Sequence, residues 1–266
     1  MEKLRLGMPA MIETPSVRHC AQVCRQLGLD FVELNLNFPQ FLLHKLDAAQ
    51  LNAIAREFSI GYTIHLDDEM SVADFNPYAA QGYTRTVVEV VQLAKKIGVR
   101  RLNMHLSRGA KYTLPDRVIY FFDAYQQDYL QNIRAFRDAC TQAVGDSDIQ
   151  ILVENTAGYL PFQRKAVELL LESPVFGLTF DIGHNYCSGN MDEDFILSHK
   201  DRLFHFHIHD TQEVGKDHRE LGTGVLDISR YLSLAQKLGA SVVLETKTVE
   251  SLEHSVAWVR SWEERK

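Results

Sequence analysis

Short strand-like segments alternate with helical segments along the whole chain, and this alternation limits the fold more than any other feature. Strand-like runs follow one another at regular intervals, and the segments between them repeat apolar residues with helical spacing. The predicted strands cover residues 4–9, 31–37, 60–68, 100–107, 148–156, 176–184, 202–210 and 241–247. The predicted helices cover 16–28, 47–58, 78–98, 116–144, 162–172, 192–199, 227–239 and the residues from 250 onward.

Glycines at the ends of several helices support the same reading. Gly28, Gly98 and Gly239 each follow a helical segment and precede a strand, where a left-handed C-cap is needed. Eight units of about 30 residues fit a closed parallel barrel better than an open doubly wound sheet. No glycine-rich dinucleotide or phosphate loop is present. We therefore expect an α/β fold, a (β/α)8 TIM barrel that forms one domain over residues 1–266.

Composition excludes several other classes of protein. The chain has 266 residues, 45% of them hydrophobic, which is enough for one large core. It contains no apolar run of the roughly 20 residues that span a membrane, and its first residues do not resemble a signal peptide. We expect a cytoplasmic protein without a membrane partner. A net charge of −7 without any basic run argues against nucleic acid as a partner. The four cysteines form no C-x-x-C pair, so we expect free thiols.

Charged residues close several strands that should be buried. Glu154, Asp181, His207 and Glu245 lie at or near the ends of the fifth to eighth predicted strands. Catalytic groups of TIM barrels gather at this end of the strands. A single buried carboxylate there could form an ion pair, but three carboxylates and a histidine together favour a shared cation. This donor set suits a divalent metal ion such as Mn²⁺, Co²⁺, Mg²⁺ or Zn²⁺.

Further polar residues fall near the same end of the barrel. Of the three histidines on the seventh strand, we expect His207 to face the barrel axis, rather than His205 or His209. The loop that follows this strand adds two more candidates. The remaining candidates for contact with substrate or a second ion are Glu33, His65, His105, His184, His218 and Arg219.

The order of these motifs resembles a known group of enzymes. ILVEN, FDIGH, FHIHD, DHRELGTG and LET, in this order, are similar to motifs of the xylose isomerase-like barrel superfamily. That superfamily contains sugar isomerases, ketose epimerases, related dehydratases and endonuclease IV. The resemblance spans nearly the whole chain. The motifs indicate the superfamily and do not distinguish the reactions within it.

The resemblance assigns roles to individual positions. It implies that one metal ion is held by the four residues Glu154, Asp181, His207 and Glu245. Glu33 would support the site or contact substrate. His184 would contact substrate as in the epimerases, whereas the matching histidine of the endonuclease is a zinc ligand. A second ion would use His65, His105, His184 and His218. The endonuclease has aspartate two residues before the last of these histidines, and this chain has Lys216, which puts a three-metal arrangement in doubt.

The leading functional hypothesis is a metal-dependent sugar or sugar-phosphate isomerase or epimerase. Glu154 and Glu245 would be the catalytic residues and would transfer a proton through an enediolate. His184 and Arg219 would orient hydroxyl groups or a phosphate. The partner would be a small sugar or polyol, and the resemblance implies a homodimer or tetramer.

Three alternatives remain open. An endonuclease IV-like phosphodiester hydrolase would use the full histidine set, but Asp67, Asp68 and Glu69 lie where DNA would pass and would repel phosphate. A dehydratase of cyclic polyols or keto acids would use the same metal and base. A barrel retained only for binding is disfavoured because all four metal ligands are intact.

Overall fold

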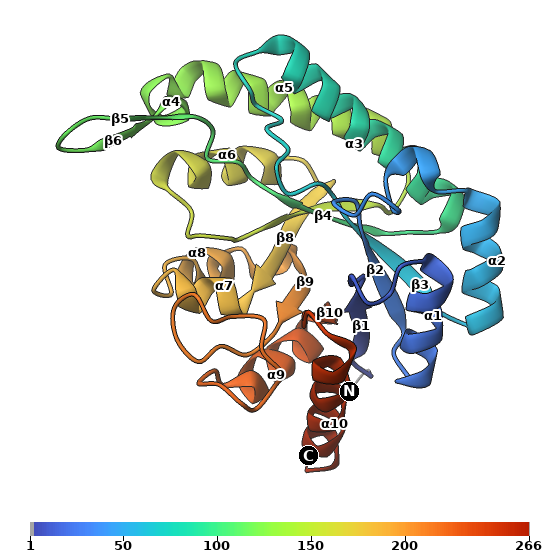
Figure 1. Cartoon of the computed structure of the whole chain (residues 1–266). Coiled ribbons are helices and arrows are strands. Elements are labelled where there is room, and N and C mark those ends of the chain that lie inside the picture. Colours follow the sequence, from blue (N-terminus) through green and yellow to red (C-terminus); the bar gives the residue numbers. More distant parts are fainter. Residues whose placement is uncertain (1–2, 266) are drawn as a thin grey trace.

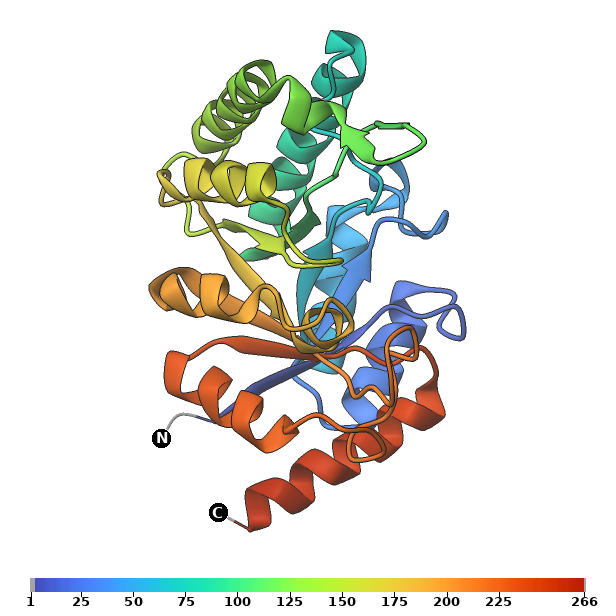
Figure 2. The same ribbon diagram turned by 90° about the vertical axis from the view of Figure 1, so that its left-hand side faces the viewer.

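The predicted barrel is confirmed. The computed structural model describes residues 3–265. Eight parallel strands close on themselves in the order β1-β10-β9-β8-β7-β4-β3-β2, with helices around the outside (Figures 1 and 2). The strands are β1 (Arg5–Pro9), β2 (Phe31–Asn35), β3 (Gly61–His65), β4 (Arg101–His105), β7 (Gln150–Glu154), β8 (Phe176–Asp181), β9 (Leu203–Ile208) and β10 (Ser241–Leu244).

The helices begin and end where side-chain chemistry favours it. Ser16, Asp47 and Thr248 accept hydrogen bonds from backbone N–H groups in the first turns of their helices. Gly98 and Gly239 end two helices with φ of 69° and 66°, as predicted. The helices are α1 (Val17–Gln26), α2 (Ala48–Phe58), α3 (Pro77–Ile97), α4 (Phe121–Ala124), α5 (Gln126–Val144), α6 (Pro161–Leu171), α7 (Ile182–Cys187), α8 (Glu193–Ser198), α9 (Ile228–Leu238) and α10 (Val249–Glu264), with 3-10 turns at η1 (Leu43–Lys45) and η2 (Lys200–Arg202).

Two element predictions were wrong. The helix expected over 116–144 begins later, because residues 111–120 form an antiparallel hairpin of β5 (Lys111–Thr113) and β6 (Val118–Tyr120). The strand expected over 176–184 ends at Asp181, because the Asp181 carboxylate caps α7 by accepting the His184 N–H at 2.7 Å. The chain therefore turns into a helix directly at a predicted metal ligand.

The barrel is buried on both faces. All six residues of β8 are buried, and the apolar sides of the surrounding helices pack against the strands. At the base of the barrel, Gly7 leaves room for the Phe31 ring, since a Cβ at position 7 would lie 2.3 Å from that ring. No helix within residues 3–265 is both long and apolar enough to cross a membrane. The four cysteines are free, as predicted.

Candidate metal centre at the carboxyl ends of the strands

The four predicted metal ligands meet at the carboxyl ends of four strands. Glu154 closes β7, Asp181 closes β8, His207 lies near the end of β9 and Glu245 directly follows β10. One donor atom from each residue lies within 4.8 Å of the donor atoms of the others. A register shift between β8 and β9 brings Asp181 opposite His207. Strands far apart in sequence thus supply a single cluster.

Three carboxylates converge in this cluster, and their neighbours are mainly imidazoles. Glu154, Asp181 and Glu245 approach one another, and among the described residues only Lys247 lies within ion-pair distance as a lysine or arginine, at 2.9 Å from Glu245. His207 Nδ1 lies 3.1 Å from Glu245 Oε2 and 3.3 Å from Glu154 Oε1. Both His207 Nδ1 and Glu245 Oε2 are buried without a hydrogen-bond partner. Unpartnered donor atoms that converge in this way fit a divalent cation.

The electrostatics keep the carboxylates of the cluster ready to bind a cation, whereas His207 has to lose a proton to bind one. Burial raises the pKa of Glu154, but His207 and His105 outweigh it and hold that pKa well below its usual range. Burial also opposes ionisation of Glu245, whose pKa is lowered by His207 and Lys247. The pKa of His207 is raised despite its burial, because Glu154, Glu33 and Glu245 surround it. The carboxylates are therefore ionised at neutral pH, the state in which they bind metal ions.

Glu33 lies beneath His207. Its side chain is 3% exposed, and its Oε1 lies 2.9 Å from His207 Nε2. Its Oε2 accepts a hydrogen bond from Thr63 at 2.9 Å and lies 3.3 Å from His205 Nε2. A carboxylate on the far nitrogen of a histidine leaves the near nitrogen free to bind a metal ion. The geometry therefore places Glu33 behind a predicted ligand, and its contact with substrate stays a prediction.

The expectation that only His207 of the three β9 histidines faces the axis was wrong. His205, His207 and His209 are all fully buried on the same side, since residues two apart in a strand point to one face. His205 faces Glu33, and His209 Nε2 lies 3.1 Å from both carboxylate oxygens of Asp181. Both histidines therefore belong to the surroundings of the cluster.

A second group of histidines lies against Glu154. His65 Nε2 and His105 Nε2 lie 3.3 Å and 3.5 Å from Glu154 Oε2, while Glu154 Oε1 faces His207. The two imidazoles also approach Asp68 Oδ1 with their other nitrogens, at 3.4 Å and 3.5 Å. The structure thus brings together His65 and His105, two of the four histidines predicted for a second ion. Glu154 lies between this pair and His207.

The remaining predicted residues lie on the other side of the cluster. His184 Nδ1 is 3.4 Å from Asp181 Oδ2, and His218 Nε2 is 3.3 Å from Glu245 Oε1. Arg219 differs from them, because its side chain is exposed and forms no hydrogen bond or ion pair with the cluster among the described residues. Its backbone pairs with that of Asp210. Its predicted contact with substrate stays a prediction.

Several residues that support the site were missed in the sequence. Asn103 donates a hydrogen bond to Glu154 Oε2 from the middle of β4. Asn155 joins the ends of β7 and β8, because its side chain donates to the Asp181 carbonyl at 2.8 Å and accepts the Asp181 N–H at 2.9 Å. A buried amide within an apolar strand was the available signal for both. The partner of each amide depends on the register of the strands, and the hydrophobic pattern of the sequence does not reveal that register.

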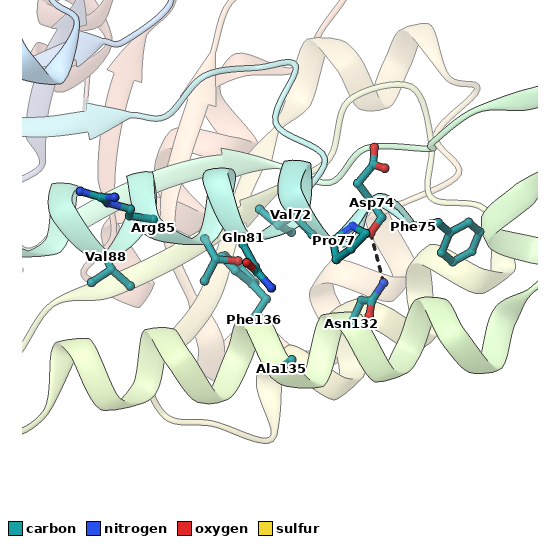
Figure 3. Close-up of a pocket in the computed structure, with 12 residues that line it drawn as sticks. Val72, Asp74, Phe75, Pro77, Gln81, Arg85, Val88, Asn132, Ala135 and Phe136 are labelled. Atoms are coloured by element: carbon teal, nitrogen blue, oxygen red, sulfur yellow. Dashed lines mark hydrogen bonds between the residues drawn. The ribbon is translucent and has the colours of Figure 1, made fainter.

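A separate hollow lies outside the barrel, between α3 and α5 (Figure 3). Its volume is about 610 Å³, and its walls are formed largely by apolar side chains such as Val88, Ala135 and Phe136. Asn132 at one end donates hydrogen bonds to the carbonyls of Ala73 and Asp74. No residue of the metal cluster lines this hollow, so it belongs to the helical layer.

Comparison with known proteins agrees with this fold. The model of the xylose isomerase-like TIM barrel family matches residues 21–262, and the chain belongs to that family. A D-tagatose 3-epimerase-like protein superposes with a TM-score of 0.80 at 17% identity, covering 98% of both chains. D-allulose 3-epimerase from Methylomonas sp., solved with D-allulose, gives 0.75 at 14% identity, covering 100% of this chain and 98% of the other. The IolI protein, solved with a zinc atom, gives 0.70 at 13% identity, covering 98% and 96%.

Proposed function

We propose that the protein is a metal-dependent isomerase or epimerase of a sugar or sugar phosphate. The observation that carries the proposal is the placement of Glu154 and Glu245 on either side of His207 Nδ1, at 3.3 Å and 3.1 Å. The two carboxylates come from opposite sides of the β8–β9 pair. Two carboxylates that flank one point can act on the two faces of a small substrate, one ionised as the base and the other protonated as the acid.

Glu154, Asp181, His207 and Glu245 would hold the ion. When bound, a divalent cation would polarise the carbonyl and hydroxyl oxygens of a sugar. One glutamate removes the proton from the carbon next to the carbonyl, and the electron pair of that C–H bond moves toward the carbonyl oxygen to give an enediolate. The other glutamate, which has to take up a proton from solvent beforehand, delivers that proton to the opposite face and inverts the carbon, and the first glutamate then releases its proton to solvent. For an isomerisation, the proton returns to the neighbouring carbon instead.

The surrounding histidines would hold the substrate. His65, His105 and His184 lie beside Glu154 and can bind the hydroxyl groups of a sugar. Asp67, Asp68 and Glu69 follow β3 near the same end of the barrel and disfavour a polyanionic partner. The likeness to epimerases of tagatose and allulose supports a small carbohydrate as the substrate class.

One observation favours a second candidate function. Glu154 presents Oε1 to His207 and Oε2 to His65 and His105, so it lies between two groups of histidines that could each help to hold an ion. Paired ions suit the hydrolysis of phosphoesters, in which they stabilise the attacking and leaving oxygens. A zinc-dependent phosphodiester hydrolase is therefore the alternative that the same residues could serve.

The test pairs a substrate screen with matched variants. The metal-loaded protein is incubated with ketoses, ketose phosphates and keto-inositols, and separately with DNA that carries an abasic site. Epimer or aldose formation that falls by about 10²–10⁴-fold in Glu154→Gln and Glu245→Gln would support the proposal. Glu263→Gln on the exposed face of α10 is the control and should retain full activity. Cleavage of the abasic site without sugar turnover would refute the proposal and favour the hydrolase.

A further inference from the structure

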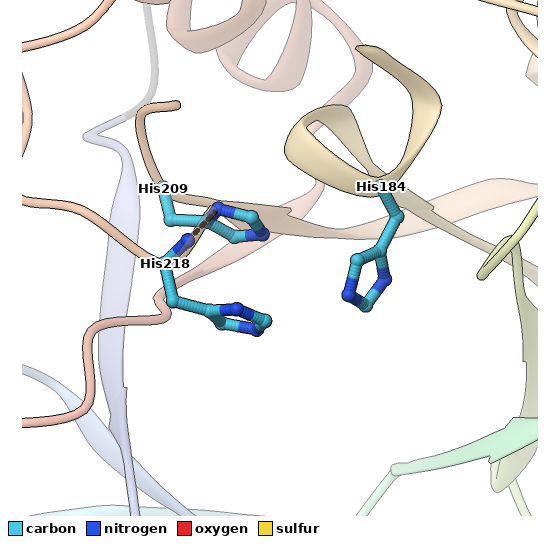
Figure 4. Close-up of side chains that lie close together, drawn as sticks. All are labelled: His184, His209 and His218. Carbon is cyan, nitrogen blue, oxygen red and sulfur yellow. Dashed lines mark hydrogen bonds between the residues drawn. The ribbon is translucent and has the colours of Figure 1, made fainter. Parts of the chain in front are cut away.

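We infer that His209 is a positioning residue, which holds the metal ligand Asp181 with one ring nitrogen and the loop carrying His218 with the other. This inference rests on the proposed metal centre. Figure 4 shows His209 at the end of β9, with His218 beside it and His184 across from both. His209 is fully buried and was not among the predicted site residues.

The hydrogen bonds fix the tautomer of His209. The backbone N–H of His218 donates to His209 Nδ1 at 2.8 Å, and a backbone N–H can only donate. Nδ1 also lies 3.4 Å from the Asp210 carbonyl, but it cannot donate to that oxygen while it accepts the shorter bond. The ring proton is therefore on Nε2. His209 is a neutral imidazole with an N–H directed at Asp181.

That Nε2–H lies equally close to both oxygens of Asp181. The distances to Oδ1 and Oδ2 are 3.1 Å each, and Oδ1 also accepts the backbone N–H of His184 at 2.7 Å. The carboxylate is thus restrained in rotation by two donors from two different elements. Restraint of this kind sets the direction in which a ligand presents its remaining lone pairs to a metal ion.

The surrounding backbone is shaped to hold this ring. A Cβ at Gly183 would lie 2.0 Å from His209 Cε1, so the glycine of the D-x-G-H motif makes room for the imidazole. His218 has a φ of +54°, and its ring stacks on that of His209 at 4.2 Å with an interplanar angle of 8°. A left-handed conformation is uncommon for a residue with a side chain. Here it accompanies a backbone N–H directed at His209.

His209 therefore connects two sides of the cluster. Through Nε2 it contacts Asp181 on β8, and through Nδ1 it fixes the segment from which His218 reaches Glu245 at 3.3 Å. A role for His209 as a metal ligand together with His184 and His218 is disfavoured, because both of its nitrogens already have partners. The loop position and the metal ligand are consequently coupled through one side chain.

Two substitutions separate the two contacts. His209→Asn retains an oxygen near the position of Nδ1 that can accept the His218 N–H, but it lacks a donor that reaches Asp181. His209→Gln places an amide N–H near the position of Nε2 and loses the acceptor for His218. Gly183→Ala, which displaces the ring, should lose both contacts. His19→Asn, at an exposed position of α1, is the control.

The readouts are Zn²⁺ affinity by chelator competition, the visible spectrum of the Co²⁺ form, and tryptic cleavage after Lys216 in the loop. We expect His209→Asn to bind Zn²⁺ about 10–100-fold more weakly and to change the Co²⁺ spectrum, with unchanged cleavage at Lys216. His209→Gln should bind metal within about threefold of wild type, by the same argument, but should be cleaved faster after Lys216, because the loop loses its anchor. Gly183→Ala should show both effects, and the control neither.

Different outcomes refute different statements. Equal Zn²⁺ affinity in wild type and His209→Asn would overturn the role of His209, as would equal weakening in the Asn and Gln variants. Loss of a whole equivalent of bound metal in both variants would make His209 a ligand instead. A wild-type protein that binds no divalent metal would refute the proposed function itself. Melting temperatures of the metal-free variants establish that each one folds.

Discussion

Substitution of Asp210 by asparagine should destabilise the loop that follows β9. Asp210 is 1% exposed, and its two oxygens accept four backbone N–H groups. Oδ1 accepts from Thr211 and Leu226, at 2.9 Å and 3.2 Å. Oδ2 accepts from Gly222 and Gly224, at 3.0 Å and 2.9 Å. In Asp210→Asn an amide NH₂ replaces one oxygen, so two of the N–H groups lose their acceptor and face another donor.

The magnitude follows from the cost of buried polar groups without partners. Each such group costs about 1–3 kcal/mol, which gives about 2–6 kcal/mol for two. Because the loop also borders solvent, water can replace part of the loss, and we expect about 2–4 kcal/mol. For a domain of this size, about 2–4 °C of melting temperature corresponds to each kcal/mol, so Tm should fall by about 4–16 °C.

Thermal unfolding of the metal-free protein and tryptic cleavage after Lys216 measure this effect. Asp227→Asn is a matched control, because Asp227 caps α9 by accepting the Arg230 N–H at 3.1 Å, and asparagine caps equally well. That control should change stability by no more than about 0.5 kcal/mol. An Asp210→Asn protein that melts within about 2 °C of wild type, with an unchanged rate of cleavage after Lys216, would refute the reasoning.

Three further predictions concern the cluster. Glu33→Gln should lower the Zn²⁺ affinity, measured by chelator competition, by about 10–100-fold, because Glu33 acts behind His207. Glu154→Gln should lower it further. Equal affinities in wild type and Glu33→Gln would contradict the role of Glu33. The metal-free protein should lose stability as pH rises above about 7, because Glu154 helps to raise the pKa of His65 from 6.5 to about 9 against its burial. That stabilisation is complete below pH 6.5 and disappears as pH passes 9, so melting curves of His65→Gln should depend less on pH. Metal affinity should also rise with pH, because an ion held by His207 displaces the proton of that imidazole, whose pKa is raised against its burial by Glu154, Glu33 and Glu245. Calorimetry in buffers of different ionisation enthalpy should show proton release.

The barrel could be predicted because its signal repeats. Eight strand and helix segments with glycine C-caps admit few folds, and the repetition compensates for errors in single segments. The hairpin at 111–120 was missed because VIYFF continues into the helical pattern of α5, so the helix was extended backwards over β6. The helix α7 was missed because its first residues, Ile182 and Gly183, read as the end of a buried strand.

The four ligands could be proposed from sequence because a barrel places the ends of all strands on one side. The residues behind them could not be assigned in the same way. The contact of His209 with Asp181 depends on the register of β8 and β9, which shifts between Leu178 and Thr179. The periodicity of the sequence does not reveal such a shift. The error about the β9 histidines had a simpler cause, since a period of two places His205, His207 and His209 on the same face.

The most direct test of the account is the metal content of the purified protein, measured by elemental analysis of wild type and of a Glu154→Gln, Glu245→Gln double variant. The account predicts at least one divalent ion bound tightly by each wild-type chain, and its loss in a double variant that still folds. A wild-type protein without bound metal that also takes up no Zn²⁺, Mn²⁺ or Co²⁺ on titration would contradict it.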